Sequence, residues 1–223
     1  ITCLVISIIP FSKVYRNAIY FINVGQGDSI LIQNKNKIVM IDTGGVKNID
    51  LATETLIPFM RSKQINHIDV LITTHNDSDH SGAVSSLIDN FPVYTYLTNK
   101  DQFPYQVGDI FLENLNTYSS SEDNDNSLVF NINFMNRKWL LMGDVSTTVV
   151  KYLIDNKRDL DCDILKVGHH GSKTSTSEAF IKATSPEEAI ISVGAKNYYG
   201  HPNDSVIDLL EKYNVTIRRT DIE

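Results

Sequence analysis

The sequence is poor in cysteine and lacks the marks of a secreted mini-protein. Only two cysteines, Cys3 and Cys162, occur among 223 residues, so no disulfide framework is possible and free thiols are expected. There is no secretory signal with a charged start and a cleavage site. No Pro/Ser-rich linker, repeat or low-complexity tract divides the chain, which is therefore expected to fold as one globular unit.

The apolar stretch at the N-terminus is too short to cross a bilayer. Residues 1–9 are apolar except at three positions, whereas a membrane helix requires about 20 apolar residues. The stretch is either the stub of a preceding transmembrane helix or an edge strand of the following domain. Because the chain begins with Ile1, it looks like a fragment or a processed product. We expect an N-terminal segment at 1–18 and one domain at 19–223.

Positive charge is also scarce. Lys and Arg number 20 against 27 Asp and Glu, giving a formal net charge of −7. A free-standing nucleic-acid binder usually shows a basic stripe, but here the basic residues are scattered, with small groups at 35–37 and 218–219. The charge argues against a simple DNA-binding surface. Bound cations would reverse the field locally and permit weak, salt-sensitive binding to phosphates.

The most informative segment is 74–80, which directly follows the apolar run 70–72. Its four potential metal ligands lie within six positions: His75, Asp77, Asp79 and His80. Ordinary turn chemistry explains a polar loop, but this spacing lets residues i and i+2 face one cation while the last pair turns towards a second. The segment predicts a metal site at the end of a strand.

Three further apolar runs lead to the same residue types. The run 139–142 precedes Asp144, 163–167 precedes the pair His169-His170, and 189–193 precedes His201. A packed core explains the strands but not these endings. Functional groups gather at the carboxyl ends of such strands, so the pattern favours a two-metal hydrolase.

With these motifs, the sequence resembles the metallo-β-lactamase superfamily and, within it, the ComEC branch of bacterial DNA-uptake proteins. The matching segments follow the order of the family over most of the chain: 21–29, 41–45, 75–82, 126–129, 142–144, 169–172 and 200–202. An aspartate at 77, where much of the superfamily has histidine, points to the ComEC branch. The resemblance implies an α/β fold, the αβ/βα four-layer sandwich, in which two mixed sheets pack face to face with helices outside.

Hydrophobic periodicity agrees with this fold. Strands are predicted at 19–24, 29–33, 37–42, 69–73, 93–97, 128–134, 138–142, 163–167, 189–193 and 215–218. Helices are predicted at 50–63, 82–90, 146–156, 177–184 and 204–213. Ser177 is expected to open one helix, and Asn203 or Asp204 to cap the last.

The resemblance also implies roles for individual residues. His75 and Asp77 match ligands of a first metal, Asp79, His80 and His169 match those of a second, and Asp144 matches the aspartate that bridges both. His170 either substitutes for His169 or faces the substrate. Asp42 supports the metal loop from behind, and Asp28 orders its own Gly-rich turn. Substrate contacts fall to His201, Lys173, Asn126 and Ser127, although Lys173 is equally well explained as a solvated lysine.

The chain departs from the superfamily at the first metal. No histidine lies between His80 and His169, and 125–127 stands where a third ligand is usual. Fewer imidazoles make a harder site, so manganese or zinc is expected, with magnesium as a competitor and incomplete occupancy. The neighbouring segment 119–126 is either an active-site loop or a plain surface loop. Tyr198 and Tyr199 either stack on a nucleobase beside His201 or simply pack.

These observations predict a dinuclear metal-dependent hydrolase, a phosphodiesterase using metal-bound hydroxide, with Asp79, His170 and His201 as catalytic residues. The resemblance implies a nuclease that degrades the non-imported strand of single- or double-stranded DNA during competence. It would act as a monomeric domain on the extracellular face of the membrane, beside the channel domain of its parent protein. The alternatives are a small-molecule hydrolase of phosphorylcholine esterase or lactonase type, and a non-catalytic module that binds metal and DNA. A β-lactam substrate is disfavoured because the first site lacks imidazoles.

Overall fold

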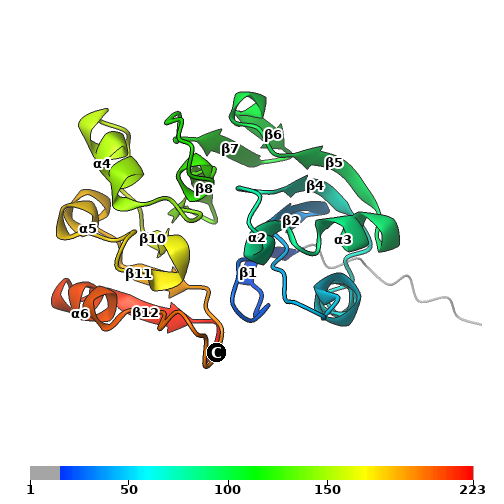
Figure 1. The fold of residues 1–223 in the computed structure, drawn as a ribbon. Coiled ribbons are helices and arrows are strands. Elements are labelled where there is room, and N and C mark those ends of the chain that lie inside the picture. Colours follow the sequence, from blue (N-terminus) through cyan, green and yellow to red (C-terminus); the bar gives the residue numbers. More distant parts are fainter. Residues whose placement is uncertain (1–15, 223) are drawn as a thin grey trace, which may run out of the picture.

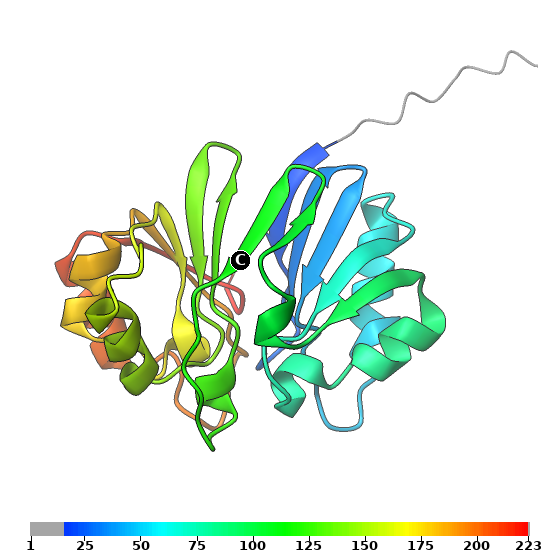
Figure 2. The ribbon, with the colours of Figure 1, turned by 90° about the horizontal axis from the view of Figure 1, so that it is seen from above.

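Two mixed β-sheets face each other at the centre of the molecule, with helices on both outer sides (Figures 1 and 2). The structure is a computed structural model that describes residues 16–222. The first sheet has the order β1-β2-β3-β4-β5: Arg16–Phe21, Ile30–Lys35, Lys37–Ile41, Ile68–Ile72 and Val93–Leu97. The second has the order β12-β11-β10-β9-β8-β7-β6; from β6 to β12 its strands are Tyr105–Val107, Ile110–Asn114, Phe130–Phe134, Arg137–Leu141, Ile164–Lys166, Glu188–Ile191 and Thr216–Arg219.

Short helices cover the outer faces or lie in the connections. The first half carries η1 (Ala52–Leu56), α1 (Ile57–Ser62), α2 (Ser78–Ser81), α3 (Val84–Asn90) and η2 (Lys100–Gln102). The second half carries η3 (Asn124–Asn126), α4 (Thr147–Asp155), η4 (Gly168–Gly171), α5 (Glu178–Thr184) and α6 (Asp204–Lys212). The predicted four-layer sandwich is therefore confirmed.

Alternation along the strands builds three apolar cores. Successive strand residues point to opposite faces, so Met40 packs under the helices of the first half while Ile41 lies between the sheets. In the same way Leu140 packs against the helices of the second half and Leu141 lies between the sheets. Because both faces of each central strand are buried, these strands read as continuous apolar runs. Each fully buried side chain of this size contributes about 1.5–3 kcal/mol.

Parallel pairing brings the functional strand ends to one edge. Ile41 pairs with Ile72 across β3 and β4, and Leu141 pairs with Lys166 across β9 and β10. The segments that follow these ends carry Asp42, the loop 74–80, Asp144 and the pair His169-His170. The sheet register thus positions all the predicted metal-binding segments at the same edge.

Most predicted elements are present, with ends that differ by three residues at most. The predicted caps are confirmed: Ser177 Oγ accepts from Phe180 N, and Asn203 Oδ1 accepts from Ser205 N. Strands β6 and β7 were not predicted. Their short segments flank a turn at Gly108 and alternate buried and exposed residues over too few positions to give a clear pattern.

The N-terminal boundary must be corrected. Arg16, Asn17 and Ala18 pair with β2 as part of β1, so the division between 18 and 19 falls inside a strand. Residues 1–9, including Cys3, lie outside the described part of the chain. Cys162 is a free buried cysteine, as predicted, and burial raises the pKa of its thiol to about 12. Across residues 16–222 no helix combines the length and apolar character that crossing a membrane requires.

Candidate metal centre

Asp42 holds the loop that follows β4. Its carboxylate accepts hydrogen bonds from the backbone N–H and the hydroxyl of Thr74, both at 2.7 Å. The same carboxylate lies 2.8 Å from Nδ1 of His80. An imidazole fixed through Nδ1 in this way turns Nε2 towards the opposite side, which is the usual arrangement of a metal-binding histidine. The position of Asp42 agrees with its predicted supporting role.

Four side chains converge on one point at the edge between the two halves. Asp79 and His80 come from α2, Asp144 follows β9, and His170 lies in η4. One ligand atom from each lies within 4.8 Å of the others. Nε2 of His80 is 3.2 Å from the Asp144 carboxylate, and Nε2 of His170 is 3.2 Å from that of Asp79. We call these four residues the metal cluster.

The metal cluster and the neighbouring His75 carry buried polar atoms that have no hydrogen-bond partner in the protein. His75 Nε2, His80 Nε2 and Asp144 Oδ1 are buried and have no hydrogen-bond partner. Buried polar atoms are nearly always paired, so three unpaired atoms beside two carboxylates suit a divalent cation. The mixture of carboxylate and imidazole is compatible with manganese or zinc.

The residues predicted for a first metal lie directly beside the metal cluster. The ring of His75 is 4.1 Å from the ring of His80, and its Nε2 is 3.7 Å from the Asp77 carboxylate. Nε2 of His169 is 3.9 Å from Asp144. The tight group of four includes neither His75 and Asp77 nor His169, which was predicted as a ligand of the second metal.

The paired histidines adopt an unusual backbone. His169 and His170 have φ values of 48° and 53°, in the left-handed region that non-glycine residues seldom occupy. Such positions cost about 1–3 kcal/mol each and concentrate at functional sites. The turn buries His170 and directs its Nδ1 to the carbonyl of Ser192 at 2.9 Å, which leaves Nε2 facing the metal cluster. The structure thus places His170, rather than His169, among the four converging side chains.

A buried ion pair lies beneath the metal cluster and was not predicted. The ammonium of Lys166 contacts the carboxylate of Asp28, and both side chains are almost completely buried. Asp28 Oδ1 is 3.6 Å from Nδ1 of His170, and Oδ2 is 3.8 Å from Nδ1 of His80. The prediction that Asp28 orders its own turn is therefore wrong, because its carboxylate reaches across to the second half. The sequence feature that could have indicated this ion pair is the presence of a lysine inside the apolar run 163–167.

Carboxylates dominate the electrostatics of the metal cluster. Burial lowers the pKa of His170, but Asp144 and Asp79 outweigh it and raise this pKa to about 9. Burial likewise opposes protonation of His80, yet Asp144 and Asp42 hold its pKa well above the usual range. Burial and the neighbouring His80 lower the pKa of His75. In the metal-free protein, protons on His80 and His170 therefore supply positive charge at the position where a metal cation is expected.

The segment 119–126 contributes to the rim of this site. Asp123 and Asn126 line a cavity of about 130 Å³ together with His75 and Asn99. The side chain of Asn126 bonds the backbone of Ser120 and so holds its own loop. Ser127 is fully buried; its hydroxyl donates to Asn124 O and accepts from Asp144 N. Ser127 thus positions Asp144 and has no surface for the substrate contact predicted for it.

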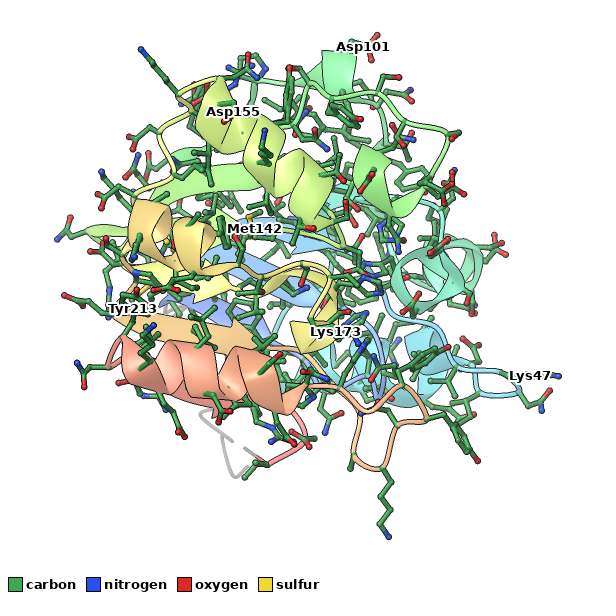
Figure 3. All side chains as sticks on the ribbon, turned by 60° about the vertical axis from the view of Figure 1, so that its left-hand side comes forward. Lys47, Asp101, Met142, Asp155, Lys173 and Tyr213 are labelled. Atoms are coloured by element: carbon green, nitrogen blue, oxygen red, sulfur yellow. The ribbon has the colours of Figure 1, made fainter. Side chains whose placement is uncertain are left out.

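Two further predicted residues lie on the solvent side. The ring of His201 is 5.7 Å from that of His169, and its buried Nδ1 has no partner. Burial, then His169 and His170, lower the pKa of His201. Lys173 is exposed just after η4, whose ribbon is yellow in Figure 3.

Comparison with known proteins agrees with this geometry. A family model described as the metallo-beta-lactamase superfamily matches residues 22–113. The fold is similar to that of YhfI from Bacillus subtilis, at 10% identity and a TM-score of 0.59 over 91% of this chain and 97% of that one. It is also similar to the metallo-β-lactamase MIM-1 from Novosphingobium pentaromativorans, at 14% identity and a TM-score of 0.54, over 77% and 84% of the two chains. The chain therefore has the metallo-β-lactamase fold.

Its curated relatives include a ComE operon protein and a competence protein, as the sequence motifs indicated. The chain is 31% identical to ComE operon protein 3 of Bacillus subtilis (strain 168) over 90% of its length, and 28% identical to competence protein ComA of Neisseria gonorrhoeae over 89%. It spans only 31% and 30% of those two proteins. The predicted ComEC-like resemblance is confirmed.

Proposed function

We propose that this domain is a metal-dependent phosphodiesterase, and specifically a nuclease. The observation that carries the proposal is the metal cluster, in which buried ligand atoms without partners converge at the edge of the sheets. Asp79, His80, Asp144 and His170 would hold one divalent ion, while His75 and Asp77, with Asp144 and His169 nearby, would hold a second. Manganese or zinc suits these donors, and magnesium is a weaker candidate. Such ions activate water and neutralise charge on phosphoryl oxygens.

The remaining side chains would act on the substrate. His201 has a pKa below the usual range and is therefore neutral near pH 7. A neutral imidazole can still donate one N–H to a phosphoryl oxygen, so His201 would orient the substrate. Lys173 would meet a phosphate as a point charge. His170 has both nitrogens engaged, towards Ser192 and the metal cluster, which leaves the donor role to His201.

DNA is the substrate that the relatives favour, because they are competence and recombination proteins by name. By extension, the domain would degrade the non-imported strand beside a membrane channel domain, on the extracellular face of the cell membrane.

A cleavage assay tests the proposal. The chain is incubated with labelled single- and double-stranded DNA in manganese, magnesium or zinc, with Asp79→Ala as the inactive variant. Asp109→Ala is the control, because Asp109 is an exposed carboxylate paired with Lys35 at the opposite edge. We expect metal-dependent cleavage by wild type and Asp109→Ala, and none by Asp79→Ala. Turnover of phosphorylcholine or lactone substrates without DNA cleavage would reject the nuclease. Metal and DNA binding without any turnover would identify a non-catalytic module.

A further inference from the structure

Two tyrosines beside the metal cluster have no part in the proposed reaction. Tyr198 is fully exposed, and Tyr199 is 72% exposed, on the loop that follows β11. Burial of aromatic rings is favourable, so two adjacent rings in water represent a surface with binding potential.

The loop that presents these rings is held from inside. The side-chain oxygen of Asn197 accepts from the N–H groups of Tyr199 and His201, at 3.2 and 3.0 Å. Its amide nitrogen donates to the carbonyls of Gly194 and His201, at 3.0 and 2.6 Å. Gly194 N in turn donates to the side chain of Gln26 in the first half. The tyrosines therefore project from a positioned backbone, which lowers the entropic cost of binding a ligand.

A series of rings connects Tyr199 to the metal cluster. The rings of Tyr199 and His201 stack at 5.8 Å and 23°. The His201 ring meets His169 edge-on at 5.7 Å, and His169 Nε2 lies 3.9 Å from the Asp144 carboxylate. We call Tyr199, His201 and His169 the ring row. It leads from solvent to the metal cluster in two ring-to-ring steps.

We infer that Tyr198 and Tyr199 form a stacking platform for an unpaired nucleobase next to the phosphodiester at the metal cluster. The inference rests on the proposed nuclease function and names its substrate class as single-stranded DNA, including frayed strand ends. In a duplex each base is covered on both faces by its neighbours, whereas an unpaired base offers a free face to an aromatic side chain. The ring row sets the platform beside the reacting phosphate and the unpaired Nδ1 of His201.

The decisive measurement compares two single-stranded oligonucleotides with the same backbone, one carrying bases and one abasic. The readout is the ratio of kcat/KM for the base-bearing strand to that for the abasic strand. We expect Tyr199→Ala to lower this ratio about 10-fold, in line with the known effect of removing one stacking ring. Tyr199→Phe keeps the ring and should retain the wild-type ratio. Tyr198→Ala should also lower the ratio.

Tyr94 provides a matched control. It is 69% exposed and stacks on His67 at 5.1 Å and 24°, nearly the same arrangement as Tyr199 on His201. It is the second residue of β5, near the end of that strand opposite the metal cluster. Tyr94→Ala should therefore leave the ratio at the wild-type value.

The outcomes separate this inference from the proposed function. If wild type cleaves both strands and Tyr199→Ala keeps the wild-type ratio, the platform is rejected and the nuclease stands. If wild type cleaves neither strand in any metal, the nuclease is rejected. In that case anisotropy of a labelled oligothymidylate in calcium tests the platform alone, and equal affinity of wild type and Tyr199→Ala rejects it. An unchanged ratio with weaker binding of the variants to phosphatidylglycerol vesicles would assign the tyrosines to a membrane surface instead.

Discussion

His170 shows at the scale of one residue how the backbone prepares a metal-binding side chain. Its left-handed φ is unfavourable, yet the turn lets Nδ1 reach the Ser192 carbonyl while Nε2 faces Asp79 and Asp144. The same carboxylates raise the pKa of this imidazole to about 9 when no cation is bound. A proton therefore occupies the site where a metal ion is proposed.

Metal binding should release protons near pH 7. The raised pKa means that His170 is protonated at this pH, whereas ligation requires the neutral ring. The apparent affinity for manganese should rise with pH up to at least about 9, because both His170 and His80 must lose a proton before they can bind the ion. Titration calorimetry at pH 7 in two buffers of different ionisation enthalpy measures the release. His67→Asn, remote from the site, should release as many protons as wild type, and identical heats in both buffers would contradict the prediction.

At the scale of one element, α2 depends on its contacts with the chain after β3. A four-residue helix is too short to be stable alone. A Cβ added to Gly45 would lie 1.8 Å from the carbonyl oxygen of Ser78, so glycine is needed for the helix to approach. This contact fixes the element that carries Asp79 and His80.

Gly45→Ala should therefore displace α2. We expect the free energy of unfolding to fall by about 1–3 kcal/mol, the usual cost of overpacking, together with weaker manganese binding. Urea unfolding and a manganese titration measure the two effects. A variant that loses stability but binds manganese like wild type would show that α2 does not position the metal cluster.

At the scale of the whole molecule, the two halves contact each other through a buried ion pair as well as through the central apolar core. Lys166 of β10 and Asp28 of the β1–β2 connection pair across the interface beneath the metal cluster. Burying two charges is costly, and the Asp28 carboxylate of this pair also lies 3.8 Å from His80 and 3.6 Å from His170. This pair connects the packing of the sheets to the geometry of the site.

Lys166→Met should destabilise the metal-free protein by about 3–5 kcal/mol, because it leaves the Asp28 carboxylate buried without its partner. Adding Asp28→Asn should recover part of the loss. Lys35→Met, which breaks the exposed pair with Asp109, is the control and should leave stability within error of wild type. Urea unfolding in a chelator measures all four proteins; equal midpoints for wild type and Lys166→Met would disprove the argument.

Most of the fold could be predicted from local sequence patterns. Apolar runs between turn residues predicted every strand except β6 and β7, and the spacing from His75 to His80 predicted the loop that the structure places at the sheet edge. Contacts between residues that are distant in the sequence could not be predicted from local patterns. Lys166 and Asp28 are 138 positions apart, and no local rule pairs them. The orientation of His169 and His170 depends on a left-handed turn that their side chains do not specify.

The order of the metal cluster along the chain has a consequence for biosynthesis. Asp79 and His80 leave the ribosome well before Asp144 and His170, and the carbonyl that holds His170 belongs to Ser192. A nascent chain that ends before β11 therefore contains all four residues of the metal cluster but not the Ser192 carbonyl. The metal cluster is therefore expected to assemble only after Ser192 has been synthesised.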